Sequence, residues 1–446
     1  MFLIEKLKKL YQGKKVLVVG LGIQGGGVGV ARFFSELGAE VTVTDKKTKK
    51  QLSISVEKLK NYSIKYHLGK HQLKDFILSD VIFKNPGVPW NLPEIIEAEK
   101  RNIPIEMEMS FTAKYFPGKI IGITGTRGKS TTTNLIYEVL KNHNFKVLLG
   151  GGLPGISNLE FLKIADKNTY LVAELSSWAL SGFHRKKLSP HIAVFTNFYP
   201  DHLNYYKNMN DYLFDKKAIY LYQKNDDYLI INEKLKDALK NDLIKSKVLT
   251  FSKDDVRFDF SNLVGDHNKE NIAAVLKVAK VLNLDIKKVY SAITNFKGLP
   301  FRQQIVLKKK NVFFVNDTTS TTPTATIYAI RRFSDKSIIL ILGGNSKNLP
   351  YQSLIDELKK SNIKKIVLLE GNFTREILPT IKQEFKEKLS IKIYDSLSKA
   401  IVKAYQEALK INDEVYLLFS PGATSFAMFN NEFHRGEEFN KIVHNL

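Results

Sequence analysis

Short apolar segments alternate with longer amphipathic segments along the whole chain. The first two apolar segments cover residues 16–20 and 40–44, and the stretch between them has a helical pattern to about Leu37. A short apolar run bounded by glycine and polar residues is typical of a strand buried on both faces of a parallel sheet. The alternation of such runs with helical segments predicts an α/β protein with mostly parallel sheets.

The same alternation continues to the C-terminus. The 446 residues are too many for one hydrophobic core and predict about three domains. Breaker residues at 104–111 and 298–300 mark the expected boundaries, so we expect domains at residues 1–108, 109–298 and 299–446. Further strands are predicted at residues 81–83, 146–149, 170–174, 192–197, 312–316, 337–342, 365–369 and 414–420, and a helix at 268–281.

Composition excludes several classes of protein. The hydrophobic fraction of 43% is ample for a folded globular protein, and the absence of cysteine excludes disulfides and thiolate metal sites. No run of about 18 apolar residues could span a membrane. The formal charge of +23 comes from lysines spread along the chain, which indicates a solvated surface that attracts small polyanionic substrates. We expect a cytoplasmic monomer without a nucleic-acid or membrane partner.

The strongest chemical signal is the segment 120–133, where an apolar strand runs into a glycine turn and a helix that begins with hydroxyl residues. In such a loop backbone N–H groups converge on phosphate oxygens, Lys129 reaches the outer phosphates, and Ser130 can ligate Mg2+. Strict Walker spacing would need glycine where Ile123 stands, so the pattern is a shorter relative. It predicts nucleoside triphosphate binding in a P-loop ATPase-like central domain. The candidate nucleotide-binding residues are Gly125, Thr126, Gly128, Lys129, Ser130 and Thr131.

A second glycine turn covers residues 20–25 and follows the first predicted strand, and Asp45 follows the second strand. Glycines permit a tight turn against a phosphate, and an acidic residue at that place can bind ribose hydroxyls. The segment 85–89, which contains Asn85 and Gly87, could close over a ligand at the strand ends. The pattern predicts a Rossmann-like, anion-binding N-terminal domain, and an NAD-dependent dehydrogenase is one interpretation of it.

Three further residues complete a candidate ATP and metal site. Glu174 ends one predicted strand and Asp201-His202 follows the next, which places both at the carboxyl edge of the predicted sheet. A lone histidine is more often structural, but this position favours a functional role. Lys216, taken alone, is typical of a solvated helix lysine.

Together these residues resemble the Mur ligase family, the ATP-dependent amide-bond-forming enzymes of peptidoglycan precursor synthesis, over the whole chain. The family's metal-binding glutamate segment matches residues 174–177, which include Ser176, and its tyrosine-x-x-x-lysine helix matches Tyr212 and Lys216. The resemblance implies that Lys216 is carbamylated and helps bind a second Mg2+. It implies catalytic roles for Lys129, His202 and Lys216, and metal ligation by Ser130, Glu174, His202 and Lys216.

The resemblance extends to the nucleotide contacts of the family. Asn268 and Asn271 are similar to its adenine-proximal helix start, Arg302 to its phosphate-contacting arginine, and Asp317 to its ribose-binding aspartate. Lys347 ends a glycine-glycine-x-x-lysine loop of the expected Rossmann-like α/β C-terminal domain.

Both ends of the chain resemble the family member that adds glutamate to UDP-N-acetylmuramoyl-L-alanine. The resemblance implies an ATP-dependent ligation through an acyl phosphate, with D-glutamate favoured as the amino acid. The implied substrate-binding residues are Gly22, Asp45, Asn85, Gly87, Ser176, Lys347, Ser425 and Phe433.

Four positions depart from the family pattern. Thr319 stands where a lysine is usual, Ala179 where a glutamine is usual, Gly152 where an asparagine is usual, and Ala427 where an aspartate is usual. They leave the phosphate-transfer residues intact and leave open L-glutamate or another amino acid. A folylpolyglutamate or polyglutamate synthase-like ligase also remains, as do, outside the ligases, a dehydrogenase and a nucleic-acid-binding ATPase.

Overall fold

The computed structural model describes residues 2–446 except 24, 153–154, 204, 258–259, 261–262, 386–388, 426–427 and 430, and only the backbone of 389–391. Contacts divide the chain into two units, which are described separately. The first unit comprises Met1–Tyr199, Asn210–Arg257 and Glu270–Asn295, and the second comprises Pro200–Met209, Phe258–Lys269 and Phe296–Leu446. Within the described ranges, no helix combines the length and apolar character needed to cross a membrane.

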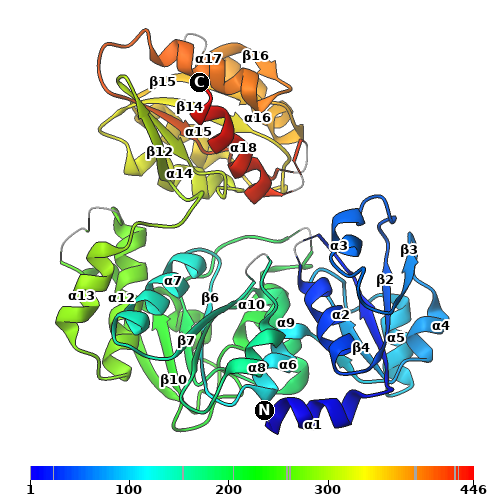
Figure 1. Cartoon of the computed structure of the whole chain (residues 1–446). Coiled ribbons are helices and arrows are strands. Elements are labelled where there is room, and N and C mark those ends of the chain that lie inside the picture. Colours follow the sequence, from blue (N-terminus) through cyan, green and yellow to red (C-terminus); the bar gives the residue numbers. More distant parts are fainter. Residues whose placement is uncertain are drawn as a thin grey trace. The chain divides into compact units, whose positions relative to one another are not determined.

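The first unit begins with a parallel sheet, drawn in blue in Figure 1. Its strands are β1 (Lys15–Val19), β2 (Glu40–Asp45), β3 (Ile64–Leu68), β4 (Val81–Lys84) and β5 (Ile105–Glu106). The helices of this part are α1 (Phe2–Tyr11), α2 (Gly26–Glu36), α3 (Ser53–Glu57), α4 (Leu73–Ile77) and α5 (Pro93–Lys100). The strand order is β3-β2-β1-β4-β5, so β1 is central and its apolar residues are buried. Phe34 of α2 packs its ring 4.4 Å from that of Phe83 in β4 and joins helix and sheet in one core.

A second parallel sheet follows, with the strand order β11-β10-β9-β6-β8-β7. Its strands are β6 (Lys119–Thr124), β7 (Val147–Gly151), β8 (Tyr170–Glu174), β9 (Ile192–Phe195), β10 (Tyr228–Asn232) and β11 (Lys247–Phe251). The helices of this part are α6 (Glu108–Tyr115), α7 (Lys129–Asn142), α8 (Phe161–Ile164), α9 (Ser177–Lys186), α10 (Met209–Lys217), α11 (Lys236–Leu239), α12 (Asp266–Val281) and α13 (Ile286–Asn295). Strand β6 lies between β9 and β8, so the segment that follows β6 starts from the middle of the sheet.

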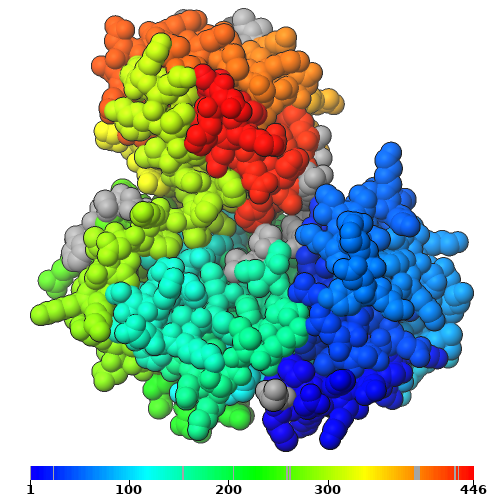
Figure 2. All heavy atoms as spheres, in the orientation of Figure 1, coloured from blue at the N-terminus to red at the C-terminus, as the bar shows by residue number. Residues whose placement is uncertain are grey.

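Side chains join the first and second sheets within the first unit. In Figure 2 the blue and cyan segments meet over a broad face. Lys163 pairs with Glu36 at 2.6 Å, and the Trp90 indole N–H donates to the Ser181 hydroxyl at 2.8 Å. One hydrophobic cluster contains residues of both sheets, which gives the unit a continuous core.

The second unit contains a sheet with the order β12-β13-β17-β14-β15-β16. Its strands are β12 (Gln304–Lys309), β13 (Val312–Asn316), β14 (Ser337–Gly343), β15 (Ile363–Leu369), β16 (Leu389–Tyr394) and β17 (Val415–Phe419). The helices are α14 (Pro323–Arg332), α15 (Gln352–Lys360), α16 (Asn372–Glu384), α17 (Leu397–Ala408) and α18 (Glu432–His444). Strand β12 runs antiparallel to β13, and the remaining paired strands run parallel.

The structure adds strands that the apolar pattern did not predict. Strands β3, β5, β11, β12 and β16 are such additions, and each forms an edge of its sheet. An edge strand is less buried, so its sequence carries more polar residues; in β11, for example, Lys247 and Val248 are exposed. Strand β10, which is internal, was also missed. The domain boundaries proposed from breaker residues stay a prediction.

Candidate functional site

Two glycines shape the loop between β6 and α7. Gly125 has φ +148° and Gly128 has φ +80°, and Gly128 caps the N-terminus of α7. A Cβ on Gly125 would lie 1.9 Å from Thr196 Oγ1, and one on Gly128 would lie 2.3 Å from Asn271 Oδ1. Only glycine fits both places, and the loop leads into the N-terminus of α7, the end of a helix that favours phosphate oxygens.

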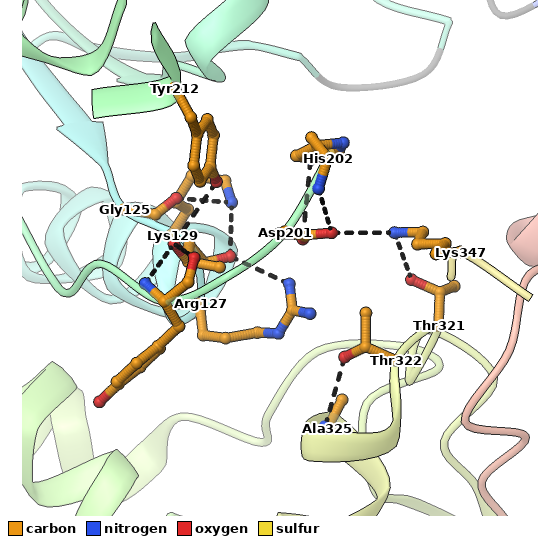
Figure 3. Close-up of polar contacts among 12 residues, drawn as sticks. Gly125, Arg127, Lys129, Asp201, His202, Tyr212, Thr321, Thr322, Ala325 and Lys347 are labelled. Atoms are coloured by element: carbon orange, nitrogen blue, oxygen red, sulfur yellow. Dashed lines mark hydrogen bonds and ion pairs between the residues drawn. The ribbon is translucent and has the colours of Figure 1, made fainter. Parts of the chain in front are cut away.

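Two lysines converge on this loop, and Figure 3 labels one of them, Lys129, beside Gly125. Lys129 Nζ donates to the carbonyls of Gly125 and Thr126, each at 3.1 Å. Lys216 Nζ donates to the same Gly125 carbonyl at 2.8 Å, although it comes from α10. The Lys216 side chain is 1% exposed and lies over the Tyr212 ring at 4.7 Å. Positive charge is therefore concentrated where the sequence predicts a triphosphate.

Thr126 has a structural part in the same loop. Its N–H donates to Asn197 O at 3.0 Å, and its hydroxyl accepts from the Tyr199 N–H at 3.0 Å. The Tyr212 hydroxyl lies 3.4 Å from the Thr126 hydroxyl. These bonds tie the loop to the segment after β9, and direct phosphate contact by Thr126 stays a prediction.

Oxygen groups suited to Mg2+ lie near the loop. Glu174 ends β8 and stands in register with Ile123 of β6, the strand that leads into the loop. Ser130 and Thr131 lie in the first turn of α7. Such a donor set fits Mg2+, which takes few protein oxygens and completes its shell with phosphate and water. The described residues contain no cluster of three or more His, Asp or Glu side chains that could hold a metal by themselves.

Ser176 serves as a helix cap. Its hydroxyl oxygen accepts from the Ala179 N–H at 3.1 Å at the start of α9. Such a bond satisfies one of the free N–H groups of the first turn. A substrate contact by Ser176 stays a prediction.

The first glycine turn lies at the carboxyl ends of β1, β2 and β4. Gly22 has φ +63°, and its N–H donates to Asp45 Oδ2 at 3.1 Å. Asn85 closes the other side, since a Cβ on Gly20 would lie 3.0 Å from Asn85 Cβ. The Gly87 N–H reaches Asn85 Oδ1 at 3.3 Å. The structure thus gathers the predicted uridine-nucleotide residues at one sheet edge, with Asp45 also supporting the turn.

Lys84, the last residue of β4, lies at the same edge of the sheet and was not among the residues predicted from the sequence. The side chain is buried over the Trp90 ring, and burial, aided by the nearby Arg185 charge, lowers its pKa to about 7. Burial also raises the pKa of Glu108 to about 7, and both residues line a small cavity of ≈ 20 Å3. Nothing local in the sequence separates Lys84 from the many solvated lysines.

In the second unit, Asp201 and His202 stand beside Lys347 (Figure 3). His202 has φ +56°, an uncommon left-handed conformation for a non-glycine residue that histidine adopts more readily than most. Its Nε2 lies 3.7 Å from Asp201 Oδ2. Lys347 Nζ lies 3.5 Å from Asp201 Oδ1 and 3.4 Å from the Thr321 hydroxyl. The predicted loop lysine is therefore paired with the aspartate of the predicted aspartate–histidine motif.

The predicted adenine-proximal asparagines have different surroundings. Asn271 belongs to the first unit, where its Oδ1 accepts from the Thr132 hydroxyl at 3.2 Å. Asn268 belongs to the second unit and donates to Val264 O at 3.0 Å. The neighbouring His267 ring lies 5.1 Å from Tyr328.

Asp317 lies in a buried network at the end of β13. Its carboxylate accepts from the hydroxyls of Ser320 at 2.5 Å and Ser420 at 2.7 Å, and from the Gln303 N–H at 3.0 Å. Burial raises its pKa to about 6 against the opposing effect of these bonds and of Arg302. Ribose binding by Asp317 and phosphate contact by Arg302 stay predictions.

The predicted amino-acid end is built around Arg435, whose side chain is buried. Its guanidinium donates to Thr318 O at 2.7 Å and to Ala423 O at 3.2 Å, which clamps the segments after β13 and β17. Phe433 packs edge-on to Phe301 at 6.3 Å. Ser425 is also buried, and its hydroxyl has no hydrogen-bond partner among the described residues.

Two of the positions that depart from the family pattern, Thr319 and Gly152, form hydrogen bonds in the structure. The Thr319 hydroxyl donates to Phe301 O at 2.9 Å, so it supports the turn that contains Phe301, which has φ +65°. The Gly152 N–H donates to Glu174 O at 3.1 Å. Ala427 and the adjacent Phe426 lie outside the described residues.

Known proteins match the chain along its length. A model of the Mur ligase middle domain matches residues 123–287, and one of the N-terminal domain of MurD-like Mur ligases matches residues 14–106. The UDP-N-acetylmuramoylalanine–D-glutamate ligase of Borreliella afzelii (strain PKo) is 34% identical over 465 residues, covering 99% of each chain. The enzyme of that name from Roseiflexus sp. (strain RS-1) is 34% identical over 469 residues, covering 97% of this chain and 98% of that protein. This chain belongs to the Mur ligase family.

Solved Mur ligase structures share the fold. The UDP-N-acetylmuramate-alanine ligase MurC of Thermotoga maritima has a TM-score of 0.62 at 19% identity, covering 97% of this chain and 99% of that one. The MurF ligase of Thermotoga maritima, solved with ADP, has a TM-score of 0.58 at 18% identity, covering 98% and 97%. The predicted family and three-domain α/β class are confirmed.

We predict that Gly128→Ala weakens nucleotide binding by this Mur ligase. The new Cβ combines an unfavourable φ with a 2.3 Å approach to Asn271 Oδ1, so the loop must move. We expect ADP affinity, measured by calorimetry, to fall at least about tenfold. Gly69→Ala is the control, because Gly69 has φ +96° but open space around it. Wild-type ADP affinity in Gly128→Ala would contradict the predicted loop geometry.

We predict a pH-dependent contribution of Asp317 to stability. Its folded pKa of about 6 lies above the ordinary value of 3.8, so the folded state binds the proton more tightly. Stability from this group is present below about pH 4 and is lost as pH rises through about 6. Relative to Asp317→Asn, the wild type should lose about 2 kcal/mol of unfolding free energy between pH 4 and 7. Urea unfolding measures this, with exposed Asp335→Asn as control; parallel pH curves for wild type and Asp317→Asn would refute it.

Proposed function

We propose that this Mur ligase joins D-glutamate to the alanine carboxylate of UDP-N-acetylmuramoyl-L-alanine, with ATP as the energy source. The full-length similarity to relatives named UDP-N-acetylmuramoylalanine–D-glutamate ligase carries the proposal. The chain is an ATP-dependent, amide-forming ligase of peptidoglycan synthesis. A dehydrogenase would explain only the first glycine turn and leaves the second phosphate loop without a purpose.

The acceptor nucleotide is assigned to the carboxyl edge of the first sheet. Support comes from the MurD-like match to residues 14–106 and from the convergence of Gly22, Asp45 and Asn85 at the strand ends. In open α/β sheets a ligand binds outside the carboxyl ends of the strands, and glycines let the backbone approach a diphosphate.

Amide formation from a carboxylate and an amine needs an activated carboxylate. Transfer of the γ-phosphoryl group of ATP to the alanine carboxylate forms an acyl phosphate and ADP. The amine of the amino acid then attacks the carbonyl carbon, phosphate leaves, and the amine loses a proton. Phosphoryl transfer depends mainly on alignment and charge neutralisation, which the N-terminus of α7 and Lys129 would supply.

Ser130 and Glu174 would hold one Mg2+, and the resemblance to the family assigns Mg2+ ligation to His202 and to Lys216 as well. Bound Mg2+ neutralises phosphate charge and aligns the transferring oxygens. The oxygen donors at the end of β8 and the start of α7 support the first assignment.

Lys216 is the residue that carbamylation would convert. Its neutral amine would add carbon dioxide and release a proton, leaving an N-carboxylate. The product keeps one N–H, which can still donate to the Gly125 carbonyl that Lys216 now contacts at 2.8 Å. It also replaces a buried cation by a carboxylate, a ligand that Mg2+ prefers.

We assign the incoming glutamate to the part of the second unit that contains Lys347, Thr321 and Ser425. The ammonium of Lys347 and the hydroxyls of Thr321 and Ser425 are suited to carboxylate groups. Thr319 brings no charge in place of the usual lysine, and its hydroxyl is engaged with Phe301 O. Lys347 is therefore the cation that we assign to the amino acid.

We predict that phosphate release requires UDP-N-acetylmuramoyl-L-alanine together with D-glutamate. Phosphate is measured across a panel of D- and L-amino acids with each enzyme variant. Lys129→Ala should lower turnover at least about 100-fold because it removes a charge at the transferring phosphate. Lys141→Ala, in the last turn of the same helix, is the matched control. Preference for L-glutamate or another amino acid would reject the stereochemical assignment, and release without the uridine nucleotide would reject the acceptor.

We predict that Lys216→Ala abolishes ligation and that acetate or bicarbonate partly restores it. A small carboxylate can occupy the space that the carbamate leaves and supply the missing oxygen ligand. Ligation rates with and without added acetate measure the rescue. The neighbouring Lys217→Ala, whose lysine pairs with Asp242, should remain active. Full activity of Lys216→Ala without added acetate or bicarbonate would contradict the carbamate proposal.

A further inference from the structure

We infer that Asn158 and Glu108 are positioning residues for the ligation: they hold Gly151 in place and thereby fix the backbone that carries Glu174. The inference rests on the proposed role of Glu174 as an Mg2+ ligand. Neither Asn158 nor Glu108 belongs to the phosphate loop or to the predicted substrate residues.

Asn158 is buried, and its carboxamide forms two hydrogen bonds with the backbone of Gly151. Its Oδ1 accepts from the Gly151 N–H at 2.7 Å, and its Nδ2 donates to the Gly151 carbonyl at 3.1 Å. A side-chain amide that bonds both polar groups of one residue fixes that residue in position and orientation. Gly151 is the last residue of β7, so these two hydrogen bonds fix the end of the strand.

Gly151 in turn lies against the backbone of Glu174. The two residues stand in register between β7 and β8. A Cβ on Gly151 would lie 2.1 Å from Glu174 O and 2.5 Å from Glu174 N, and Gly151 has φ +96°. The next N–H, from Gly152, donates to Glu174 O at 3.1 Å. A displacement of Gly151 must therefore displace Glu174.

Glu108 anchors the other side of Asn158. Its Oε1 accepts from the Asn158 N–H at 2.6 Å and from the Ser157 hydroxyl at 2.9 Å. Glu108 begins α6, which packs against α8 and α9. The anchor thus ties Asn158 to a helix.

The same anchor touches α2, the helix that begins directly after the first glycine turn. A Cβ on Gly29 would lie 2.3 Å from Ser157 Cβ, and one on Gly26 would lie 3.4 Å from Glu108 Oε2. The helix that follows the turn assigned to the uridine nucleotide therefore packs on the residues that hold Gly151. A continuous series of contacts runs from Gly26 and Gly29 through Glu108 and Asn158 to the Glu174 backbone.

The orientation of a carboxylate decides how well it serves an Mg2+ ion, because this ion demands near-ideal octahedral geometry. Residues behind a metal ligand accordingly change metal affinity by about 10- to 100-fold when they are removed. A merely structural role for Asn158 would lower stability and leave metal affinity unchanged.

The test measures Mn2+ binding to the full-length protein in the presence of ADP, by the loss of the free-ion signal in electron paramagnetic resonance. Asn158→Ala should weaken Mn2+ binding about tenfold. Asn311→Ala is the matched control, since Asn311 Nδ2 also bridges backbone carbonyls, those of Ile411 and Asp413, in the second unit. Thermal unfolding checks that each variant is folded.

A second pair of variants keeps the test independent of Asn158. Glu108→Ala should weaken Mn2+ binding to a similar extent, whereas Glu108→Gln keeps an oxygen acceptor for the Asn158 N–H and should stay within about threefold of wild type. Mn2+ affinity equal to that of Asn311→Ala in both alanine variants would overturn the inference. Failure of the unsubstituted protein with ADP to bind Mn2+ would instead overturn the proposed metal role of Glu174, and the inference with it.

Discussion

The carbonyl of Gly125 is the point on which the candidate site depends, because two ammonium groups from different elements donate to it. Lys129 reaches it from the start of α7, and Lys216 reaches it from α10. The carbonyl can take this position only because Gly125 has no side chain, since a Cβ there would overlap Thr196 Oγ1. A triphosphate carries charge of the opposite sign, which agrees with the proposal that this loop binds ATP. Loop geometry and the local concentration of positive charge thus follow from one close backbone approach.

Glycines play a similar part elsewhere in the molecule. Gly29 lets α2 approach Ser157, and Gly151 lets β7 end directly against Glu174. In each case the missing side chain allows two segments to meet, and a buried polar side chain then fixes the contact: Glu108 beside Ser157, and Asn158 at Gly151. Buried polar groups hold such contacts well because breaking one hydrogen bond leaves its partner unsatisfied in a low-dielectric interior.

Much of the fold could be predicted from the apolar pattern. Strands such as β8, at Tyr170–Glu174, are continuous apolar runs between polar segments, and a run of this kind can hardly be placed anywhere but in a buried sheet. Edge strands such as β3 and β12 were missed because solvent contact on one side allows polar residues and weakens the pattern. The phosphate loop was predictable because its glycines, lysine and hydroxyl residues are consecutive, so that local chemistry alone identifies them.

The sequence by itself therefore determined the α/β class, the phosphate loop and the resemblance to Mur ligases, because each is written in contiguous residues. Only the tertiary structure decided which distant residues meet. It brought Lys216 to the carbonyl of Gly125, buried Lys84 over Trp90, and placed Asn158 on Gly151. It also showed that Ser176 caps a helix and that Thr319 bonds to Phe301. Local patterns record whether a residue is buried, whereas its partners depend on the packing of segments far apart in the chain.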